Sequence, residues 1–253
     1  MSGHSKWATI KHKKGAADAK RGKVFSKLAK EITVIAKAGG GDPGNNPALR
    51  TILAKAKSVN MPNDNIDRAI KKGTGELAAD ILEEITYECY GAGGVGLVVK
   101  VLTDNKNRAA AEVRNVFKKN NTEFATLGSV SRNFERKGTI MIAAEDATED
   151  QLMEVVLNAG ADDMESEEGG FTVTCAPSAF AGVCEALEQA GIAFDQENSV
   201  VGLTPTAFTA VNDVAVAKSV NKFIAALEEL DDVQDVFTNM DMADDIAEAA
   251  LED

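Results

Sequence analysis

The chain has 253 residues, of which 44% are hydrophobic and only 5% are aromatic, so we expect a core of aliphatic side chains. It carries 27 Lys and Arg against 40 Asp and Glu, a formal net charge of −13. No apolar run reaches the roughly 18 residues of a membrane span. Its three cysteines, Cys89, Cys175 and Cys184, form neither a disulfide framework nor a metal-ligand pair, and they are typical of core residues in a reducing compartment.

The charge is distributed unevenly along the chain. Residues 1–73 hold 16 basic and 5 acidic residues, a net charge of +11, and residues 74–137 are neutral. Residues 138–253 hold 2 basic and 26 acidic residues, a net charge of −24. Such asymmetry indicates a nucleic-acid surface at the basic end, although a run of charge can also be no more than a solvated face.

The first 40 residues predict an arm followed by an amphipathic helix. Residues 1–19 have no sustained apolar period, and we expect them to become ordered on binding. Phe25, Leu28 and Ile32 then recur at helical spacing, and the glycines at 39–41 end the pattern. Lysines fall on the opposite face of this helix. They are Lys20, Lys23, Lys27, Lys30 and Lys37.

Two shorter helices follow and complete a predicted three-helix unit over residues 20–73. Asn46 and Pro47 are a good helix start, an N-cap residue followed by proline at the first position. Pro62 opens the third helix, and Gly73 is expected to close it.

The glycine-rich segment GAGGVG, residues 91–96, satisfies the spacing of a dinucleotide-binding loop. Such a loop needs a helix directly after it, because the helix N-terminus holds the pyrophosphate. The residues that follow, LVVKVL, instead predict a strand over 97–102, paired with a strand over 85–90. We therefore interpret the glycines as a hairpin connection.

The remaining elements fall into two groups. A run of strand, helix, strand, strand, helix, strand is typical of a ferredoxin-like domain. Its elements are predicted at 139–144, 148–159, 161–166, 171–175, 178–190 and 192–201. A helix over 106–121 and a strand over 129–134 precede this run, and a helix over 211–230 and a strand over 233–238 follow it. Since the inner run is already complete, the flanking elements must belong together in a domain that the run interrupts.

The sequence thus predicts an α+β protein of three domains, namely an N-terminal three-helix domain and two ferredoxin-like α/β domains, the third inserted into the second. The predicted boundaries are 1–80 for the basic helical domain with its arm, 81–137 and 205–240 for the discontinuous middle domain, and 138–204 for the acidic insertion. We expect the acidic tail, 241–253, to form a frayed helix.

No catalytic or metal-binding group stands out in the sequence. His4 and His12 both lie in the arm, and neither has a cysteine at metal-ligand spacing. The acidic clusters lack the spacing of a calcium loop. We expect a protein that is not an enzyme and that has no cofactor and no metal.

The basic N-terminal region carries the predicted nucleic-acid contacts, because lysine and arginine neutralise phosphates and need clustering more than fixed spacing. The candidates are Lys6, Trp7, Lys11, Lys13, Lys14, Lys20, Arg21, Lys23, Lys27 and Lys30. Trp7 has two alternatives, stacking on a base or anchoring the arm by burial. Two further basic groups are Arg68, Lys71 and Lys72, which can instead complement a helix dipole, and the weaker patch of Arg108, Arg114, Lys118 and Lys119.

Several motifs, taken together and in order, closely resemble the YebC family, the bacterial group related to the mitochondrial translational activator of cytochrome oxidase subunit I. They are GHSKWATIKHKKGAADAKRGKVFSKLAKEI, GGGDPGNNPALR, NMPNDNIDRAIKKGTGE, YECYGAGGVGLVV and TDNKNRAAAEVRNVF. The match runs from Gly3 to about Phe134 and resumes more weakly over EELDDVQDVFTN.

The resemblance implies a non-enzymatic regulator of gene expression with a helical domain and two α/β domains. It implies DNA, or ribosomal or messenger RNA, as partner, with the ribosome as a candidate, no membrane and no defined oligomeric state. Because the family motif begins at Gly3, it also implies no transit peptide and a cytoplasmic protein. The alternative is a scaffold that senses a small molecule or binds proteins through its ferredoxin-like domains, which rests on fold analogy alone.

Overall fold

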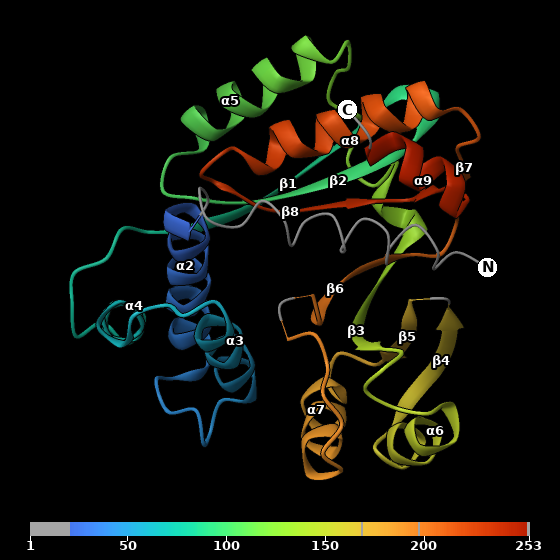
Figure 1. The fold of residues 1–253 in the computed structure, drawn as a ribbon. Helices are drawn as coiled ribbons and strands as arrows, with labels where there is room; N and C mark the ends of the chain where they lie inside the picture. The colour runs from blue at the N-terminus through green and yellow to red at the C-terminus, as the bar shows by residue number, and fades with distance from the viewer. Residues whose placement is uncertain (1–20, 168, 197, 252–253) are drawn as a thin grey trace. The chain divides into compact units, whose positions relative to one another are not determined.

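The computed structural model describes residues 21–167, 169–196 and 198–251, which form two compact units (Figure 1). One unit consists of Val24–Ala79 and Arg136–Gly202, and the other of Asp80–Glu135 and Leu203–Asp253 with the start of the first helix. N-terminal helices precede regions that contain sheets, so the expected α+β class is confirmed. The three-domain boundaries stay a prediction.

The N-terminal helices are α2 (Arg21–Gly39), α3 (Pro47–Ser58) and α4 (Asn63–Thr74). Helix α2 ends as expected, and Gly40 follows it with a φ of +86°. The predicted cap of α3 is confirmed, since the Asn46 side chain accepts a hydrogen bond of 3.1 Å from the Leu49 amide. Helix α4 runs one residue beyond the expected end, because the left-handed cap falls at Gly75 rather than at Gly73.

Gly73 has a different role, which is to let α4 approach α2 closely. A Cβ atom at Gly73 would lie 2.5 Å from the Thr33 carbonyl oxygen and 2.7 Å from the Ala36 Cβ. Thr33 itself is buried, and its hydroxyl donates to the carbonyl oxygens of Ala29, at 2.8 Å, and Ala69, at 3.1 Å. The three helices share one aliphatic core. It includes Leu28, Ile32, Leu49, Ile52, Ala56, Met61, Ile66 and Ala69.

The second unit is built on a three-stranded antiparallel sheet in the order β1-β2-β8. Its strands are β1 (Glu83–Tyr90), β2 (Gly96–Thr103) and β8 (Val233–Thr238). The glycine-rich segment joins β1 to β2, with Gly93 and Gly94 both at positive φ. The hairpin interpretation of this segment is therefore confirmed.

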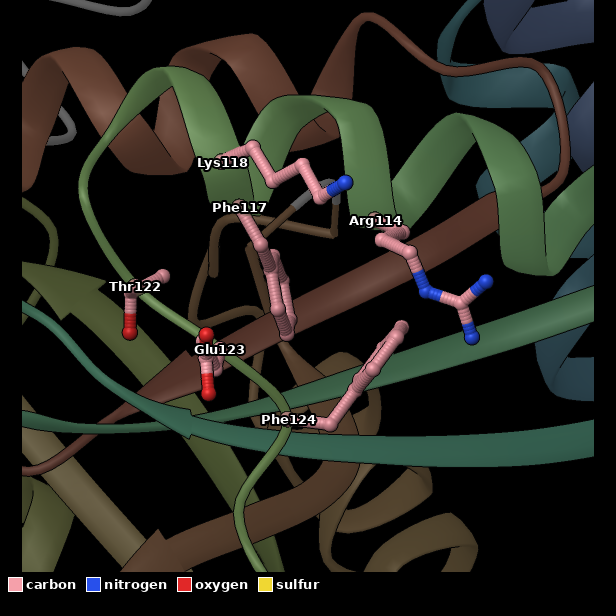
Figure 2. A pocket seen from close by; sticks show the side chains of 6 residues that line it. All are labelled: Arg114, Phe117, Lys118, Thr122, Glu123 and Phe124. Atoms are coloured by element: carbon pink, nitrogen blue, oxygen red, sulfur yellow. The ribbon is translucent and has the colours of Figure 1, made fainter.

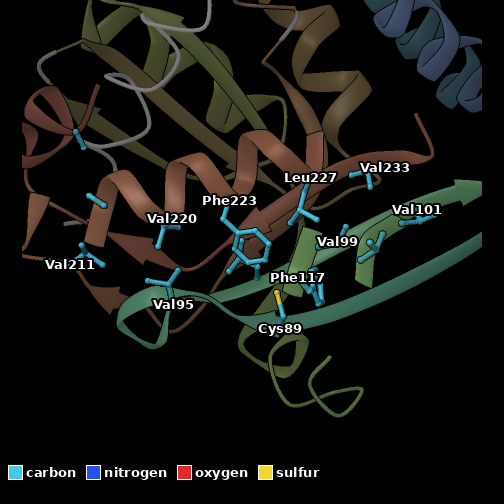
Figure 3. Close-up of a cluster of buried hydrophobic side chains, with 14 of the residues drawn as sticks. Cys89, Val95, Val99, Val101, Phe117, Val211, Val220, Phe223, Leu227 and Val233 are labelled. Carbon is cyan, nitrogen blue, oxygen red and sulfur yellow. The ribbon is translucent and has the colours of Figure 1, made fainter. Parts of the chain in front are cut away.

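Side chains cover both faces of this sheet. On one face, Phe223 of α8 (Val214–Glu228) and Phe117 of α5 (Lys106–Lys119) pack against alternate β2 residues such as Val99 (Figure 3). On the other face, Val98 packs against Val130 and Phe134. Because both faces are buried, β2 reads as a nearly continuous apolar run and not as an alternating pattern.

The predicted strand at 129–134 is wrong, whereas the predicted strand at 139–144 is confirmed as the second half of a longer strand. A single strand, β3 (Phe134–Ala143), follows a short 3-10 turn at Ser131–Asn133. The preceding backbone is not free to form a strand, because the Glu88 carboxylate binds the amides of Gly128, Val130 and Ser131. The β1-β2-β8 sheet consequently lacks the fourth strand that we expected there.

The inserted region follows the ferredoxin-like order. After β3 come α6 (Glu149–Asn158), β4 (Ala161–Glu167), β5 (Gly170–Cys175), α7 (Phe180–Gln189) and β6 (Val200–Pro205), and the sheet order is β4-β5-β3-β6. The last strand was expected at 192–201 and lies later. Asp195 forms a turn before it, accepting hydrogen bonds from the Asn198 amide at 3.1 Å and side chain at 3.0 Å.

The acidic tail is not frayed over its described residues. Helix α9 (Asp244–Leu251) buries Ala247 and Ala250 in the same core as α5 and α8. A short parallel pair, β7 (Thr209–Ala210) with β9 (Met240–Asp241), precedes it. Apolar residues at helical spacing therefore outweigh the acidic composition of this segment.

Candidate nucleic-acid interface

Most of the predicted arm lies outside the described residues. This applies to Lys6, Trp7, Lys11, Lys13, Lys14 and Lys20, so the two alternatives for Trp7 both stand. Arg21 is the first residue of α2.

The described part of the lysine face of α2 consists of Lys23, Lys27, Lys30 and Lys37. Lys37 is exposed and the other three are half-buried, and they lie on the side opposite the buried Leu28 and Ile32. Lys27 and Lys30 both interact with other groups. The structure thus confirms that α2 is amphipathic, with an aliphatic face that is buried and a lysine face that is not.

Lys23 already has an acidic partner. Its ammonium group donates to the Glu229 carboxylate at 2.8 Å and to the Glu229 carbonyl oxygen at 2.7 Å. The hydrogen bond to the Glu229 carboxylate raises the pKa of Lys23. A phosphate that binds this lysine must therefore compete with Glu229.

A more accessible basic group lies on α4. Arg68, Lys71 and Lys72 are all exposed, and their spacings of three and four residues place them on one face of the helix. They also lie toward the C-terminal end of α4, where positive charge is favourable. The N-terminal half of the same helix exposes two acidic residues, Asp64 and Asp67.

Four of the five basic residues of α5 fall into two pairs, and the fifth, Lys119, is exposed at the end of the helix. At the start of the helix, Lys106 binds Glu83 at 2.5 Å, and Arg108 binds Asp104 at 2.6 Å and Asp232 at 2.8 Å. Asp232 is buried, so the Arg108 contact stabilises the fold of this unit.

Near the end of α5, Arg114 and Lys118 instead border a cavity (Figure 2). The Arg114 guanidinium carbon lies 5.4 Å from the centre of the Phe124 ring. Arg114 and Lys118 belong to the weaker basic patch predicted from the sequence, whereas Phe124 was not predicted to lie beside them. No pattern in the sequence indicated that the segment after α5 folds back beneath Arg114.

Glu88 is a second residue that sequence analysis missed. The residue is 2% exposed, and its carboxylate accepts hydrogen bonds from the Gly128, Val130 and Ser131 amides and from the Ser131 hydroxyl, at 2.7–3.0 Å. Burial by itself raises the pKa of Glu88, but these donors outweigh it and hold the pKa below its usual value. The signal in the sequence was an acidic residue between Tyr87 and Cys89 in a predicted strand.

The cysteine thiols are unsuited to nucleophilic chemistry at neutral pH. Burial raises the pKa of Cys89 and of Cys184 to about 12, and that of Cys175 to about 11. Within the described ranges, no group of His, Cys, Asp or Glu side chains could hold a metal ion. Over the same residues, every helix is too short or too polar to cross a membrane.

Comparison with known proteins covers nearly the whole chain. Residues 5–76 match the family described as "TACO1/YebC protein N-terminal domain", and residues 82–240 match "TACO1/YebC second and third domain". A "probable transcriptional regulatory protein" of Treponema denticola is 53% identical over 242 residues, which cover 96% of this chain and 97% of that protein. A protein of the same description from Opitutus terrae is 50% identical, over 99% of this chain and 100% of that protein.

A solved structure agrees with these matches. The crystal structure of a conserved hypothetical protein, Aq1575 of Aquifex aeolicus, superposes with a TM-score of 0.79 at 43% sequence identity. The superposition covers 89% of this chain and 92% of that one. The family resemblance seen in the motifs is therefore confirmed, and the chain belongs to the TACO1/YebC family.

Proposed function

We propose that this protein is a non-enzymatic, nucleic-acid-binding regulator of gene expression that holds phosphates on its basic N-terminal region. The observation that carries the proposal is the separation of charge, +11 over residues 1–73 against −24 over residues 138–253. Relatives about 50% identical are named as probable transcriptional regulatory proteins, which supports a regulatory role.

Two described surfaces contribute to binding in this proposal. The lysine face of α2 continues the basic arm, and the exposed group Arg68, Lys71 and Lys72 adds a second contact on α4. Lysine and arginine on helix surfaces form charge-assisted hydrogen bonds with phosphate oxygens. Such contacts position a nucleic acid without reading its sequence.

The chemistry of α4 favours structured RNA, or DNA bound with little sequence preference. Helices α3 and α4 are joined by four residues, 59–62, a spacing found in helix-turn-helix proteins. In those proteins, the N-terminal residues of the second helix contact bases. Here that part of α4 exposes Asp64 and Asp67, which repel the phosphates beside a major groove. We therefore favour a role in translation, with the ribosome as the candidate partner.

The test compares paired charge reversals in the full chain. Lys71→Glu/Lys72→Glu removes exposed charge from the proposed surface, while Lys218→Glu/Lys222→Glu makes the same change on exposed positions of α8. Binding to a duplex DNA and to a structured RNA hairpin of equal length is measured over a range of salt concentrations. About five phosphate contacts on the duplex give a log–log slope near −4 to −5.

We expect the α4 variant to lose about tenfold in affinity and to show a shallower slope, and the α8 variant to bind nearly as the wild type. Equal losses in both variants would mean that only net charge matters, and a salt-independent affinity would overturn the proposal. Cross-linking in cells, followed by sequencing of DNA and RNA, separates transcription from translation. Recovery of promoter DNA without ribosomal RNA would contradict the translational role.

A further inference from the structure

A cavity of about 310 Å³ lies at the C-terminal end of α5, within a single compact unit. The residues that line it are Arg114, Phe117, Lys118, Thr122, Glu123 and Phe124 (Figure 2). Its volume is at the lower end of the roughly 300–1,000 Å³ typical of small-molecule pockets. The cavity is therefore large enough for one small ligand or one unit of a polymer.

The aromatic wall of the cavity is held in place by its neighbours. The Phe124 ring lies 4.9 Å from the Phe117 ring and 5.1 Å from the Tyr87 ring, measured between ring centres. Phe117 is itself fully buried and packs against Phe223 of α8. Because Phe124 is already positioned, a ligand that stacks there has little side-chain entropy to overcome.

The two cations beside this wall, Arg114 and Lys118, differ from Lys106 and Arg108, which form ion pairs with acidic residues of the same unit. Lys118 follows Arg114 by four residues, so both lie on the same face of α5. Both are exposed, and among the described residues neither forms an ion pair. Arg114 rests on the Phe124 ring, which leaves the N–H groups at the edge of its guanidinium plane able to donate.

Glu123 restricts what the cavity can accept. Its exposed carboxylate lines the same cavity, so a bare anion meets both attraction and repulsion there. A ligand that carries an aromatic ring with an amino group, as well as a negative group, matches Phe124, Glu123 and the two cations. The amino group can donate to Glu123, the ring can stack on Phe124 and Arg114, and the negative group can bind Arg114 and Lys118.

We infer that this cavity binds one unpaired nucleotide of an RNA strand, with the base against Phe124 and Arg114 and the phosphate on Arg114 and Lys118. The inference rests on the proposed function, because it adds a second contact for the same nucleic acid. It assigns to the α5 region a preference for single strands, since a base inside a duplex cannot leave its stack without cost.

The experiment uses the full chain and a labelled single-stranded RNA of 12 nucleotides, with a duplex of the same sequence beside it. Phe124→Leu keeps most of the apolar volume but removes the aromatic face, and Arg114→Gln and Lys118→Gln each remove one charge. Lys106→Gln is the matched control, because this residue lies at the opposite end of α5 and binds Glu83. Thermal melting of each variant checks that it is folded.

We expect Phe124→Leu and Arg114→Gln to lower the affinity for the single strand by about 5–10-fold, the size of one lost base stack. Lys118→Gln should reduce the salt slope by about 0.7, whereas Phe124→Leu should leave the slope unchanged. The Lys106→Gln variant should bind as the wild type does. If Phe124 only supported the fold, Phe124→Leu would not lower the affinity while leaving the salt slope unchanged.

Unchanged affinity in all three cavity variants, with binding still lost in Lys71→Glu/Lys72→Glu, would overturn the inference and leave the proposed function standing. If the wild type binds neither RNA nor DNA, the proposed function fails, and titration with AMP followed by NMR still decides the cavity. Shifts near Phe124 that disappear in Arg114→Gln would keep a nucleotide site and assign it to free mononucleotides. No such shifts would overturn the site altogether.

Discussion

Glu88 shows at the scale of one residue how a buried charge organises a loop. Its carboxylate accepts hydrogen bonds from three backbone amides in the segment 128–131, so these amides are paired without a neighbouring strand. A carboxylate that accepts several backbone hydrogen bonds is stabilised in its charged form despite burial. The loop shape therefore depends on this one side chain being ionised.

Replacing Glu88 with glutamine should lower the free energy of unfolding by about 1–3 kcal/mol at pH 7. The glutamine NH2 group would then face backbone N–H groups of the loop, and two donors cannot form a hydrogen bond with each other. Since folding lowers the pKa of Glu88, the wild type keeps its full extra stability over the variant at any pH above the pKa of this carboxyl in the unfolded state. This extra stability should then disappear as the pH falls through the folded pKa. Urea unfolding of both proteins between pH 7 and pH 3.5 measures this.

The control for this measurement is Glu84→Gln, an exposed position on the same strand and the same side of it. We expect that variant to match the wild type within about 0.5 kcal/mol at each pH. A Glu88→Gln variant as stable as the wild type at pH 7 would show that the loop is held by other contacts.

At the scale of elements, α9 shows that composition can mislead where periodicity does not. Residues 241–253 are rich in acidic residues, which suggested fraying, yet Ile246, Ala247 and Ala250 lie on one face and pack into the core. The small side chains of Ala247 and Ala250 allow the helix to approach α8 closely.

Ala247→Asp should therefore lower the free energy of unfolding by about 2–3 kcal/mol, because it places a charge in an apolar contact. The matched control is Ala111→Asp, which makes the same change at an exposed position of α5. Chemical unfolding of the two variants measures the difference. Equal stability of the two would mean that α9 does not pack on the core in solution.

Most helices and strands were predictable because their patterns are local. The N-cap at Asn46, the glycine turn at 91–96 and the aliphatic face of α2 each follow from neighbouring residues alone. The errors lie where a distant side chain intervenes, as Glu88 does for the segment before β3. Strand β6 was displaced by the turn at Asp195, which the apolar pattern around it had hidden.

On the scale of the whole molecule, the described residues hold four groups of buried apolar residues, three of them large. One belongs to α2, α3 and α4, a second to the ferredoxin-like region, and a third to the β1-β2-β8 sheet with its helices. Cores that share no residues can unfold independently, and two-state behaviour is then not expected.

Heating the full chain in a calorimeter should therefore produce more than one transition. Gly73→Ala should lower only the midpoint temperature of the transition that belongs to the helical core, because the new Cβ atom would overlap Thr33 and Ala36. Ala247→Asp should lower only the midpoint temperature of the transition that belongs to the β1-β2-β8 sheet and the helices packed on it. If Gly73→Ala also lowers the midpoint temperature of the ferredoxin-like region, the predicted division of residues 1–80 and 138–204 into separate domains is wrong.

The amino-acid sequence alone determined the α+β class, the family, and the separation of a basic from an acidic end, because these follow from periodicity, motif order and charge counts. Only the tertiary structure decided that Lys23 binds Glu229, that Glu88 shapes a loop and that Phe124 lies beneath Arg114. Each of those contacts joins residues from different elements. Local sequence patterns carry no information about which elements meet, since packing of the whole unit decides it.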